Sequence, residues 1–490
     1  MVVLVVFMLR LYNTLSHTIE DFVPINPPKV GIYSCGPTVY DYQHIGHMRR
    51  YVGDDILVRV LKHNGYDVKH VMNITDVGHL VSDADTGEDK MEKGAAKFGM
   101  SVWDIAKKFE EQFFDSEELL NIKRPDIVIH ATDAIGDQIE LISILEEKGY
   151  TYKTTDGMYF DTSKFPRYFD LSGQNPQALM AGARVEMITG KKNISDFALW
   201  KFSYPNGRSL DSVEDAPRGT RDDTTLKRAM EWDSPWGTGF PGWHIECSAM
   251  SMKSLGSTLD IHTGGIDHIT IHHTNEIAQS ESASGKKFVN YWVHHNFLTV
   301  DTQKMSKSLG NFYTVEDIKQ KGFEPLALRY LYFQTHYRQE MNFTFGALSA
   351  AQTALFRLYE EVVKLGMPKK ESCTDFEQRF FEALNEDVNM PKAIGIMWEM
   401  LNSKRAANAK VASLLVFDDI LGLNLWDVLD IGFKKKEEKI PQNILDLAAQ
   451  RNALRKERRF HLADEVRSKI EKLGYTIDDK KGGKTEIKKI

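Results

Sequence analysis

Cysteine is scarce in this chain, and long apolar runs are missing from it. Its 490 residues include three cysteines, Cys35, Cys247 and Cys373, which are far apart and odd in number. This pattern argues against a disulfide framework and favours reduced thiols that can bind metal or react. Because no apolar stretch approaches the length that spans a bilayer, we expect no membrane partner.

The N-terminal segment lacks the features of a secretory leader. MVVLVVFMLRLYN is apolar, but it has no charged leader, no long apolar core and no small-residue cleavage site. We therefore expect a cytoplasmic protein. Either Met1 or Met8 could be its true start.

Charge is distributed unevenly along the chain. The net charge is −7, yet residues 433–490 hold 17 Lys and Arg against 10 Asp and Glu, a balance of +7 that leaves −14 for the rest. A basic terminal segment can supply the phosphate contacts of a nucleic-acid-binding protein. Charge alone fits a solvated helix with a charged tail equally well.

The segment after residue 29 predicts the fold class. The β-prone run VGIYS leads into a turn and an amphipathic pattern with Val52, Ile56 and Val60, and the strand-like run VKHVMNI follows. Strand, helix and strand within about forty residues make a βαβ unit. An α/β fold is therefore expected, with a Rossmann-like, doubly wound parallel sheet that binds ligands beyond the carboxyl ends of its strands.

The chain is long enough for several domains, and its patterns divide it into three parts. Residues 1–320 are predicted to form the Rossmann-like catalytic domain, with an insertion at about 121–235. Residues 321–432 show the three- and four-residue apolar spacing of an α-helical bundle. Residues 433–490 are predicted to form a small basic C-terminal module whose charge suits a nucleic acid.

Two short motifs lie at either end of the sheet region. HIGH, at residues 44–47, opens the helix after the first strand, and KMSKS, at residues 304–308, comes at the end. Imidazoles at a helix N-terminus can hydrogen-bond phosphate oxygens, and Gly46 lets adenine approach the backbone. A lysine-serine run is usually solvated surface, but Lys304 and Lys307 could also hold a departing pyrophosphate.

In this order the two motifs resemble the signature pair of class I aminoacyl-tRNA synthetases. The resemblance implies attack by an amino-acid carboxylate on the α-phosphorus of ATP, with Mg²⁺ accompanying the triphosphate. It assigns His44 and His47 to the α-phosphate region and Lys307 to the pyrophosphate. Asp267, after two glycines, matches the place where related enzymes contact the ribose.

Four residues of zinc-binding types lie near these motifs. Cys35 follows the first strand, Cys247 follows GWHIE, and His272 and Glu276 lie four apart on one face of a predicted helix. Thiolate, imidazole and carboxylate ligands suit Zn²⁺. The spacing is loose, so the residues alone leave open buried cysteines and histidines that only pack in the core.

Longer segments narrow the resemblance to cysteinyl-tRNA synthetases. From about Leu11 to the C-terminus, the chain resembles that family at CGPTVYDYQHIGH, NITD, GWHIECSAMS, HHTNEIAQS, VNYW and KMSKSLGNF, in the same order. The resemblance implies one Zn²⁺ per chain, held by Cys35, Cys247, His272 and Glu276 and joined by the substrate thiolate. His273 is expected to point about a hundred degrees away round the helix.

The same resemblance implies the substrates and the pocket. A metal that binds sulfur rejects serine and alanine, which a pocket that only measures size cannot do, so we expect no editing domain. Gly36, Thr75 and Trp243 are assigned to the substrate pocket, although Trp243 could equally be a core aromatic. The implied partners are L-cysteine, ATP and tRNA(Cys), and we expect a monomer. The resemblance also implies that residues 321–432 form a stem-contact and bundle domain and that residues 433–490 form the tRNA- and anticodon-binding module.

Two departures from the family pattern concern the pocket wall. VGHLVSDADTGEDK follows NITD where an acidic pair and a lysine are common, and Ile271 and Thr274 replace the proline and the first glutamate of PHHENE. Both leave the zinc ligands intact but put in doubt a carboxylate that would support them. Cys373 is expected to be a surface or packing thiol without a role.

Two alternative functions remain open at this point. A cysteine:amino-sugar ligase would share the catalytic domain and the adenylate but attach cysteine to an amine. A non-catalytic paralogue would keep the fold and bind zinc or RNA without turnover. The basic segment after Phe433 favours tRNA over an amino sugar, and the intact HIGH and KMSKS motifs argue against the paralogue.

Overall fold

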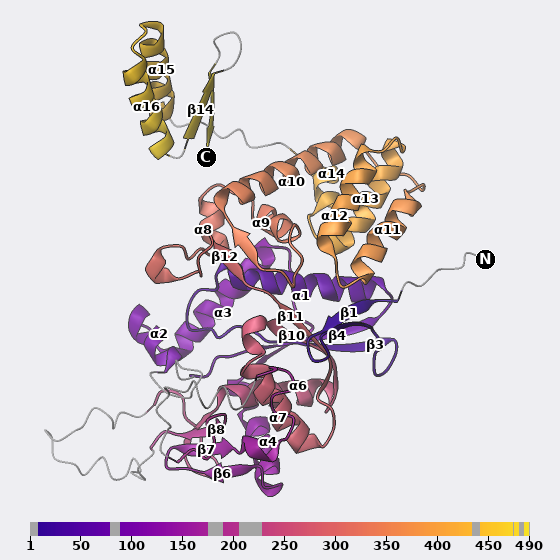
Figure 1. Cartoon of the computed structure of the whole chain (residues 1–490), viewed down its shortest axis with the longest axis vertical. Coiled ribbons are helices and arrows are strands. Elements are labelled where there is room, and N and C mark those ends of the chain that lie inside the picture. Colours follow the sequence, from indigo (N-terminus) through magenta and orange to yellow (C-terminus); the bar gives the residue numbers. More distant parts are fainter. Residues whose placement is uncertain are drawn as a thin grey trace, which may run out of the picture.

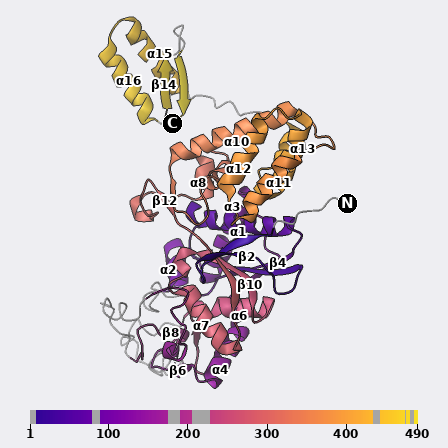
Figure 2. The same cartoon turned by 45° about the vertical axis from the view of Figure 1, so that its right-hand side comes forward.

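A computed structural model describes most of the chain as three regions. The described residues are 8–78, 89–174, 190–204, 228–433, 442–473, 475–479 and 485–489. Figures 1 and 2 show a sheet domain, a helical bundle packed on one end of it, and a small C-terminal module that stands apart in both views.

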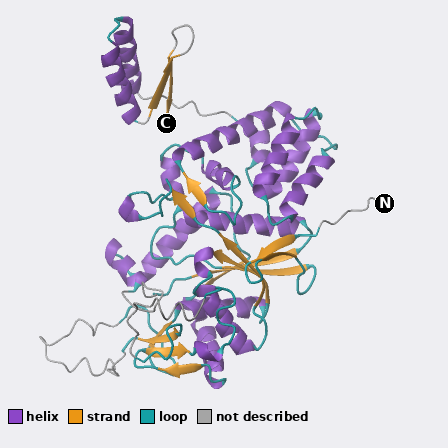
Figure 3. Cartoon of the chain, in the orientation of Figure 1, coloured by secondary structure: helices purple, strands orange, loops and turns teal. Residues whose placement is uncertain are grey.

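The centre of the sheet domain is a five-stranded parallel sheet, so the predicted α/β class and βαβ unit are confirmed (Figure 3). The strand order is β11-β10-β3-β4-β5, and every neighbouring pair is parallel. The strands are β3 (Lys29–Ser34), β4 (Asp67–Ile74), β5 (Ile127–His130), β10 (Leu259–Gly265) and β11 (Val289–His295).

Helices cover both faces of this sheet, because its strands alternate apolar residues toward two cores. Ile32 belongs to the core under α1 (Ile45–His63) and α3 (Val102–Leu119), whereas Tyr33 belongs to the core under α4 (Ile135–Glu147), α6 (Trp243–Leu255) and α7 (His272–Ser284). The chain leaves β3 toward β4 but later returns on the other side as β10. The order of connection therefore reverses between β3 and β10, where doubly wound sheets bind ligands.

A second, antiparallel sheet is inserted in the chain between β5 and β10 of the central one. It consists of β6 (Thr151–Lys153), β7 (Gly157–Phe160), β8 (Phe197–Phe202) and β9 (Gly239–Pro241). The predicted insertion at 121–235 also took in β5 and α4, but β5 pairs with β4 in the central sheet. The boundary differs because the short run IVIH extends the parallel sheet with no turn signal to set it apart.

The remaining parts are mostly helical. A hairpin of β1 (Arg10–Asn13) and β2 (Thr18–Asp21) precedes the sheet. Helix α2 (Lys90–Phe98) lies beside α3. The bundle region contains β12 (Leu298–Val300), paired with β13 (Met341–Phe343), and the helices α8 (Val315–Gln320), α9 (Pro325–Tyr332), α10 (Phe345–Leu365), α11 (Thr374–Asn385), α12 (Met390–Asn402), α13 (Ala407–Leu421) and α14 (Leu425–Ile431).

The C-terminal module has a core of its own. Helices α15 (Gln442–Lys456) and α16 (Phe460–Lys472) pack with a hairpin of β14 (Tyr475–Asp479) and β15 (Thr485–Lys489) around Ile444, Ile470 and Ile477. The sequence analysis predicted a separate module here but not its hairpin. Among the described residues, no helix is long and apolar enough to cross a membrane.

The bundle and the sheet domain are joined by a buried arginine. Arg329 of α9 is fully buried, and its guanidinium donates to the Asp55 carboxylate of α1 (2.6 Å) and to the carbonyl oxygens of Leu421 (2.6 Å) and Leu120 (2.9 Å). Asp55 also accepts from Arg59 at 2.8 Å. One side chain thus connects α9, α1, α13 and the end of α3.

Replacing this arginine should destabilise the protein strongly. Arg329→Leu removes the cation that Asp55 binds and takes a hydrogen-bond donor from two buried carbonyl groups. This loss should lower the free energy of unfolding by about 3 kcal/mol or more. The midpoint of urea unfolding measures the loss. Arg379→Leu is the control, because the Arg379–Glu399 pair lies on the surface and should leave the midpoint almost unchanged. Equal midpoints for both variants would contradict this account of the junction.

Candidate functional site

The HIGH motif forms the N-terminus of α1. His44 is the N-cap, and its Nδ1 accepts the backbone N–H groups of Gly46 (3.1 Å) and His47 (3.2 Å). Because Nδ1 is an acceptor, the ring proton lies on Nε2, and burial lowers the pKa of His44 to about 4. The motif therefore presents a neutral imidazole with an Nε2–H donor, with the His47 ring stacked on it at 3.6 Å between centroids.

Gly46 has a reason to be glycine within the protein itself. A Cβ at this position would lie 2.9 Å from Cε1 of the His44 ring and 3.7 Å from Cε of Met305. The missing side chain makes room for the capping ring, whereas Met305 of the KMSKS loop would be at an ordinary van der Waals distance. The sequence-based role, access of adenine to the backbone, is compatible with this packing.

The KMSKS loop lies over the HIGH motif. Met305 is buried against Gly46, and the Phe312 ring meets the His44 ring edge-on at 5.3 Å between centroids. Lys307, on the short helix η6 (Lys307–Leu309), forms an ion pair with Asp41, whereas Lys304 is exposed. The two signature motifs thus form one surface, although they lie about 260 residues apart in the chain.

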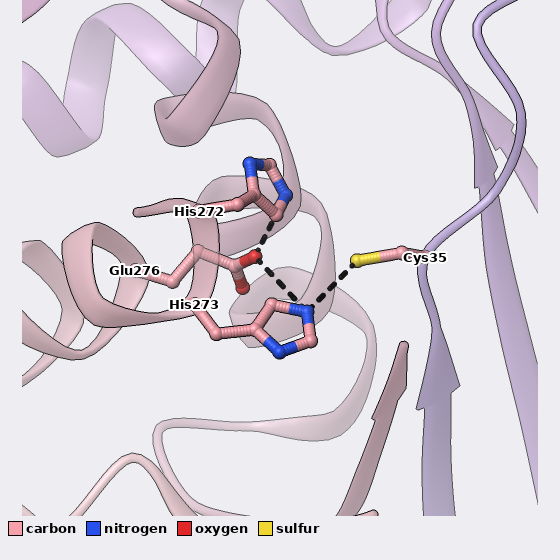
Figure 4. A group of neighbouring side chains, drawn as sticks. All are labelled: Cys35, His272, His273 and Glu276. Carbon is pink, nitrogen blue, oxygen red and sulfur yellow. Dashed lines mark hydrogen bonds and ion pairs between the residues drawn. The ribbon is translucent and has the colours of Figure 1, made fainter. Parts of the chain in front are cut away.

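A buried cluster of metal-binding groups lies at the carboxyl end of β3 (Figure 4). Ligand atoms of Cys35, His272, His273 and Glu276 all lie within 4.8 Å of one another. His272 Nε2 is 2.9 Å from Glu276 Oε1, and His273 Nε2 is 3.3 Å from Cys35 Sγ. This corrects the expectation that His273 points away, because both long imidazoles at the start of α7 reach back toward the strand end.

Cys247 lies beside this cluster rather than within it. Its Sγ, from α6, is 4.0 Å from Cys35 Sγ. Two thiolates on one tetrahedral zinc are about 3.8 Å apart, given Zn–S bonds of about 2.3 Å. In addition, Glu276 Oε1 is buried and accepts no well-directed hydrogen bond. The sulfur spacing and the position of this oxygen, which pairs with His272 without hydrogen-bond geometry, fit a Zn²⁺ ion among Cys35, Cys247, His272 and Glu276.

The electrostatics of the cluster favour a cation. Burial alone would raise the pKa of Glu276, but the positive charges of His262 and His272 lower it to about 2. Burial opposes the charge on His272, yet the Glu276 carboxylate raises the pKa of that ring to about 10. The pKa of Cys35 is lowered despite burial, chiefly by a hydrogen bond from Cys247. Anionic oxygen and sulfur are thus held together inside the protein.

Further histidines orient the cluster. His262 Nε2 contacts Glu276 Oε2 at 2.9 Å, His244 Nδ1 contacts His272 Nδ1 at 3.0 Å, and His294 Nε2 contacts the Nδ1 of His273 at 2.7 Å. Such contacts fix the direction in which ligands point. Sequence reasoning did not identify His244, His262 or His294. The clustering of histidines in the sequence could have identified them, because seven of the 16 histidines lie within residues 244–295.

The predicted substrate residues border the cluster. Gly36 must be glycine, because a Cβ there would collide with the carbonyl oxygen of Asn73. Thr75 Oγ1 donates to Glu246 Oε2 at 2.9 Å, and both side chains are buried. The half-buried Trp243 ring lies 4.4 Å from the His272 ring between centroids, so it faces the cluster. Gly36 and Thr75 come just after the carboxyl ends of β3 and β4, and Trp243 faces the cluster from α6.

The remaining predicted positions lie as follows. Asp267 is exposed on η5 (Ile266–His268), directly after β10. Thr274 replaces the expected glutamate and donates to the carbonyl of Ile269 at 2.7 Å, so it supplies no carboxylate to the ligands. Residues 79–88, which hold most of the departure after NITD, lie outside the described residues. Cys373 is buried, so it is a packing thiol rather than a surface thiol.

Comparison with known proteins decides the family. The model of the class I (C) tRNA synthetase catalytic domain matches residues 21–220 and 222–353. Cysteine–tRNA ligase 1 of Burkholderia lata is 45% identical over 96% of this chain and 95% of its own length. The chain belongs to the cysteine–tRNA ligase family. The family's enzyme of Treponema denticola is 42% identical over 98% of this chain and 100% of its own length.

A solved structure of another class I enzyme agrees with the fold. Methionyl-tRNA synthetase of Mycobacterium tuberculosis, in complex with methionyl-adenylate, is similar with a TM-score of 0.57. The match covers 84% of this chain and 95% of that one, at 14% identity. At this identity the likeness concerns the fold alone. It agrees with the Rossmann-like central sheet and the helical region that follows it.

Proposed function

We propose that this chain activates L-cysteine with ATP and transfers it to the 3′ end of tRNA(Cys). The observation that carries the proposal is the buried sulfur, imidazole and carboxylate cluster next to the HIGH motif. Arg50, in the second turn of α1, donates to the carbonyl oxygen of Cys35 and so ties the two together. A site for a thiol and a site for phosphates would then lie close together, as cysteine activation requires.

The phosphate side of the site uses the two signature motifs. His44 donates from Nε2 to the α-phosphate region, and His47 stacks on it. Lys307 and Lys304 neutralise the departing pyrophosphate, whose charge is largest in the transition state. Asp267 binds the ribose, and Mg²⁺ accompanies ATP as a part of the substrate.

The cysteine side of the site uses the cluster. Cys35, Cys247, His272 and Glu276 hold one Zn²⁺, which would bind the substrate sulfur as thiolate and so reject serine and alanine. Trp243, Thr75 and Gly36 border the space for the amino acid. His273 is held by His294 and faces the sulfur of Cys35, which makes it a hydrogen-bonding neighbour of the ligands rather than a member of the set.

Transfer of the amino acid requires tRNA binding, which we assign to residues 433–490. This module carries the positive charge that the acidic remainder lacks. The relatives align over 96% and 98% of the chain, so their similarity extends to this module. No observation favours the amino-sugar ligase or the non-catalytic paralogue. A monomer and a cytoplasmic location stay predictions.

Amino-acid-dependent ATP–pyrophosphate exchange, followed by charging of total tRNA, tests the function. We expect exchange with cysteine but not with serine or alanine, and we expect the product to be cysteinyl-tRNA. Exchange with cysteine but without charging would favour the amino-sugar ligase. Absence of exchange with any amino acid would favour the non-catalytic paralogue.

Metal analysis tests the zinc site. The purified protein should contain one zinc per chain, and Cys247→Ala should lower the content severalfold because a thiolate ligand is lost. Cys373→Ala is the matched control, since this thiol is also buried but lies in the helical bundle. Equal zinc in both variants would remove Cys247 from the ligand set.

Truncation tests the C-terminal module. A protein ending before Phe433 should retain cysteine activation, because every residue of the proposed ATP and zinc sites precedes it. Charging of tRNA should fall strongly, and the remaining activity should depend less on salt. A truncated protein that charges tRNA as well as the full chain would show that recognition lies elsewhere.

A further inference from the structure

We propose that Asp41 and Lys97 are positioning residues. They keep the Lys307 ammonium in an ion pair beside the HIGH motif until ATP binds. This inference rests on the proposed pyrophosphate role of Lys307 and deepens it. It assigns a function to a carboxylate and a lysine that lie in neither signature motif.

The contact involves three separate elements. Asp41 comes from the loop between β3 and α1, Lys97 from the last turn of α2, and Lys307 from η6. One carboxylate oxygen, Asp41 Oδ2, pairs with Lys307 Nζ and, at 2.9 Å, with Lys97 Nζ. The Asp41 side chain is 19% exposed, whereas the two lysines are about half exposed. A shielded anion is therefore shared by two cations.

The ion pair forms while the KMSKS loop is docked. Lys307 Nζ lies 4.8 Å from the centroid of the Phe312 ring, which itself contacts His44. The ammonium is thus close to the imidazole that we assign to the α-phosphate, but its charge is satisfied by Asp41. Before Lys307 can neutralise a pyrophosphate, the phosphate oxygens must displace this carboxylate.

Lys97 lowers the cost of that displacement. If Asp41 had no second partner, the departure of Lys307 would leave a partly buried carboxylate without a counter-charge. Because Lys97 bonds the same oxygen, Asp41 keeps a cation throughout. The departure also separates two ammonium groups that share one oxygen, and repulsion by Lys97 is one reason that the pKa of Lys307 is lowered, after burial.

The position of Lys97 is fixed by the packing of α2. A Cβ at Gly94 would lie 2.7 Å from the carbonyl oxygen of Tyr40, so the helix touches the residue just before Asp41. At its other end, Asp89 caps the helix and pairs with Arg228. Lys97 is thus held against the loop that carries Asp41.

Steady-state ATP dependence of ATP–pyrophosphate exchange, at saturating cysteine, tests the proposal in the full-length protein. Asp41→Asn keeps the side-chain size and removes the charge, so Lys307 is released and the KM for ATP should fall about two- to fivefold, the range expected for partly exposed ion pairs. Lys97→Met removes the second cation from Asp41, so Asp41 binds Lys307 more tightly. The KM for ATP should therefore rise by a similar factor. In both variants kcat should change less than KM.

Opposite changes in KM distinguish this role from a structural one. In the Asp41→Asn background, Lys97→Met should have no further effect, since the lysine acts through the carboxylate. Exposed Lys107→Met on α3 is the control for loss of a lysine and should leave KM unchanged. If both single variants raise KM, or if neither changes it, the proposal is overturned.

Lys307→Ala separates this inference from the function on which it rests. We expect this variant to slow adenylate formation strongly, and adding Asp41→Asn to it should not lower the KM for ATP. If Lys307→Ala forms adenylate slowly but Asp41→Asn alone leaves the KM for ATP unchanged, only the proposed role of the Asp41–Lys307 ion pair is overturned. If Lys307→Ala forms adenylate at the normal rate, Lys307 does not bind the pyrophosphate. The proposed role of the Asp41–Lys307 ion pair is then overturned as well.

Discussion

The buried charges at the carboxyl end of β3 are the constraint on which the catalytic domain depends. A carboxylate or thiolate without a partner costs several kcal/mol inside a protein, so the cluster can exist only if every ionised group has a counter-charge or a hydrogen bond. His262 and His272 meet Glu276, and His273 meets Cys35. The domain places β3, β10, α6 and α7 so that all these groups converge.

The same region links the cluster to the proposed phosphate site at the HIGH motif. Arg50 bonds the carbonyl of Cys35 and pairs with Asp54 at 3.4 Å, and Asp54 in turn contacts His295 at 3.0 Å. Because these contacts run through α1, the helix that presents HIGH is fixed relative to the residue that begins the metal cluster. Fixed geometry between two reacting groups is what an adenylation reaction needs from a protein.

Much of this arrangement could be predicted from the sequence, and the reasons for the rest are physical. The βαβ unit around HIGH was predictable because local periodicity determines it. His262, His244 and Asp41 were not predicted, because each acts through a partner distant in sequence, such as Glu276, His272 or Lys307. The predicted direction of the His273 side chain was wrong. Helical geometry fixes where a Cβ points but not how far an imidazole ring extends toward the strand end. The strand β5 was included in the insertion because its run is too short to show a period.

We expect the substrate sulfur to join a zinc ion held by Cys35, Cys247, His272 and Glu276. X-ray absorption at the zinc edge, recorded with and without L-cysteine, tests this coordination. We expect two sulfur ligands in the protein alone, a third when cysteine is added, and no change with L-serine. A sulfur count that stays the same at saturating cysteine would contradict it.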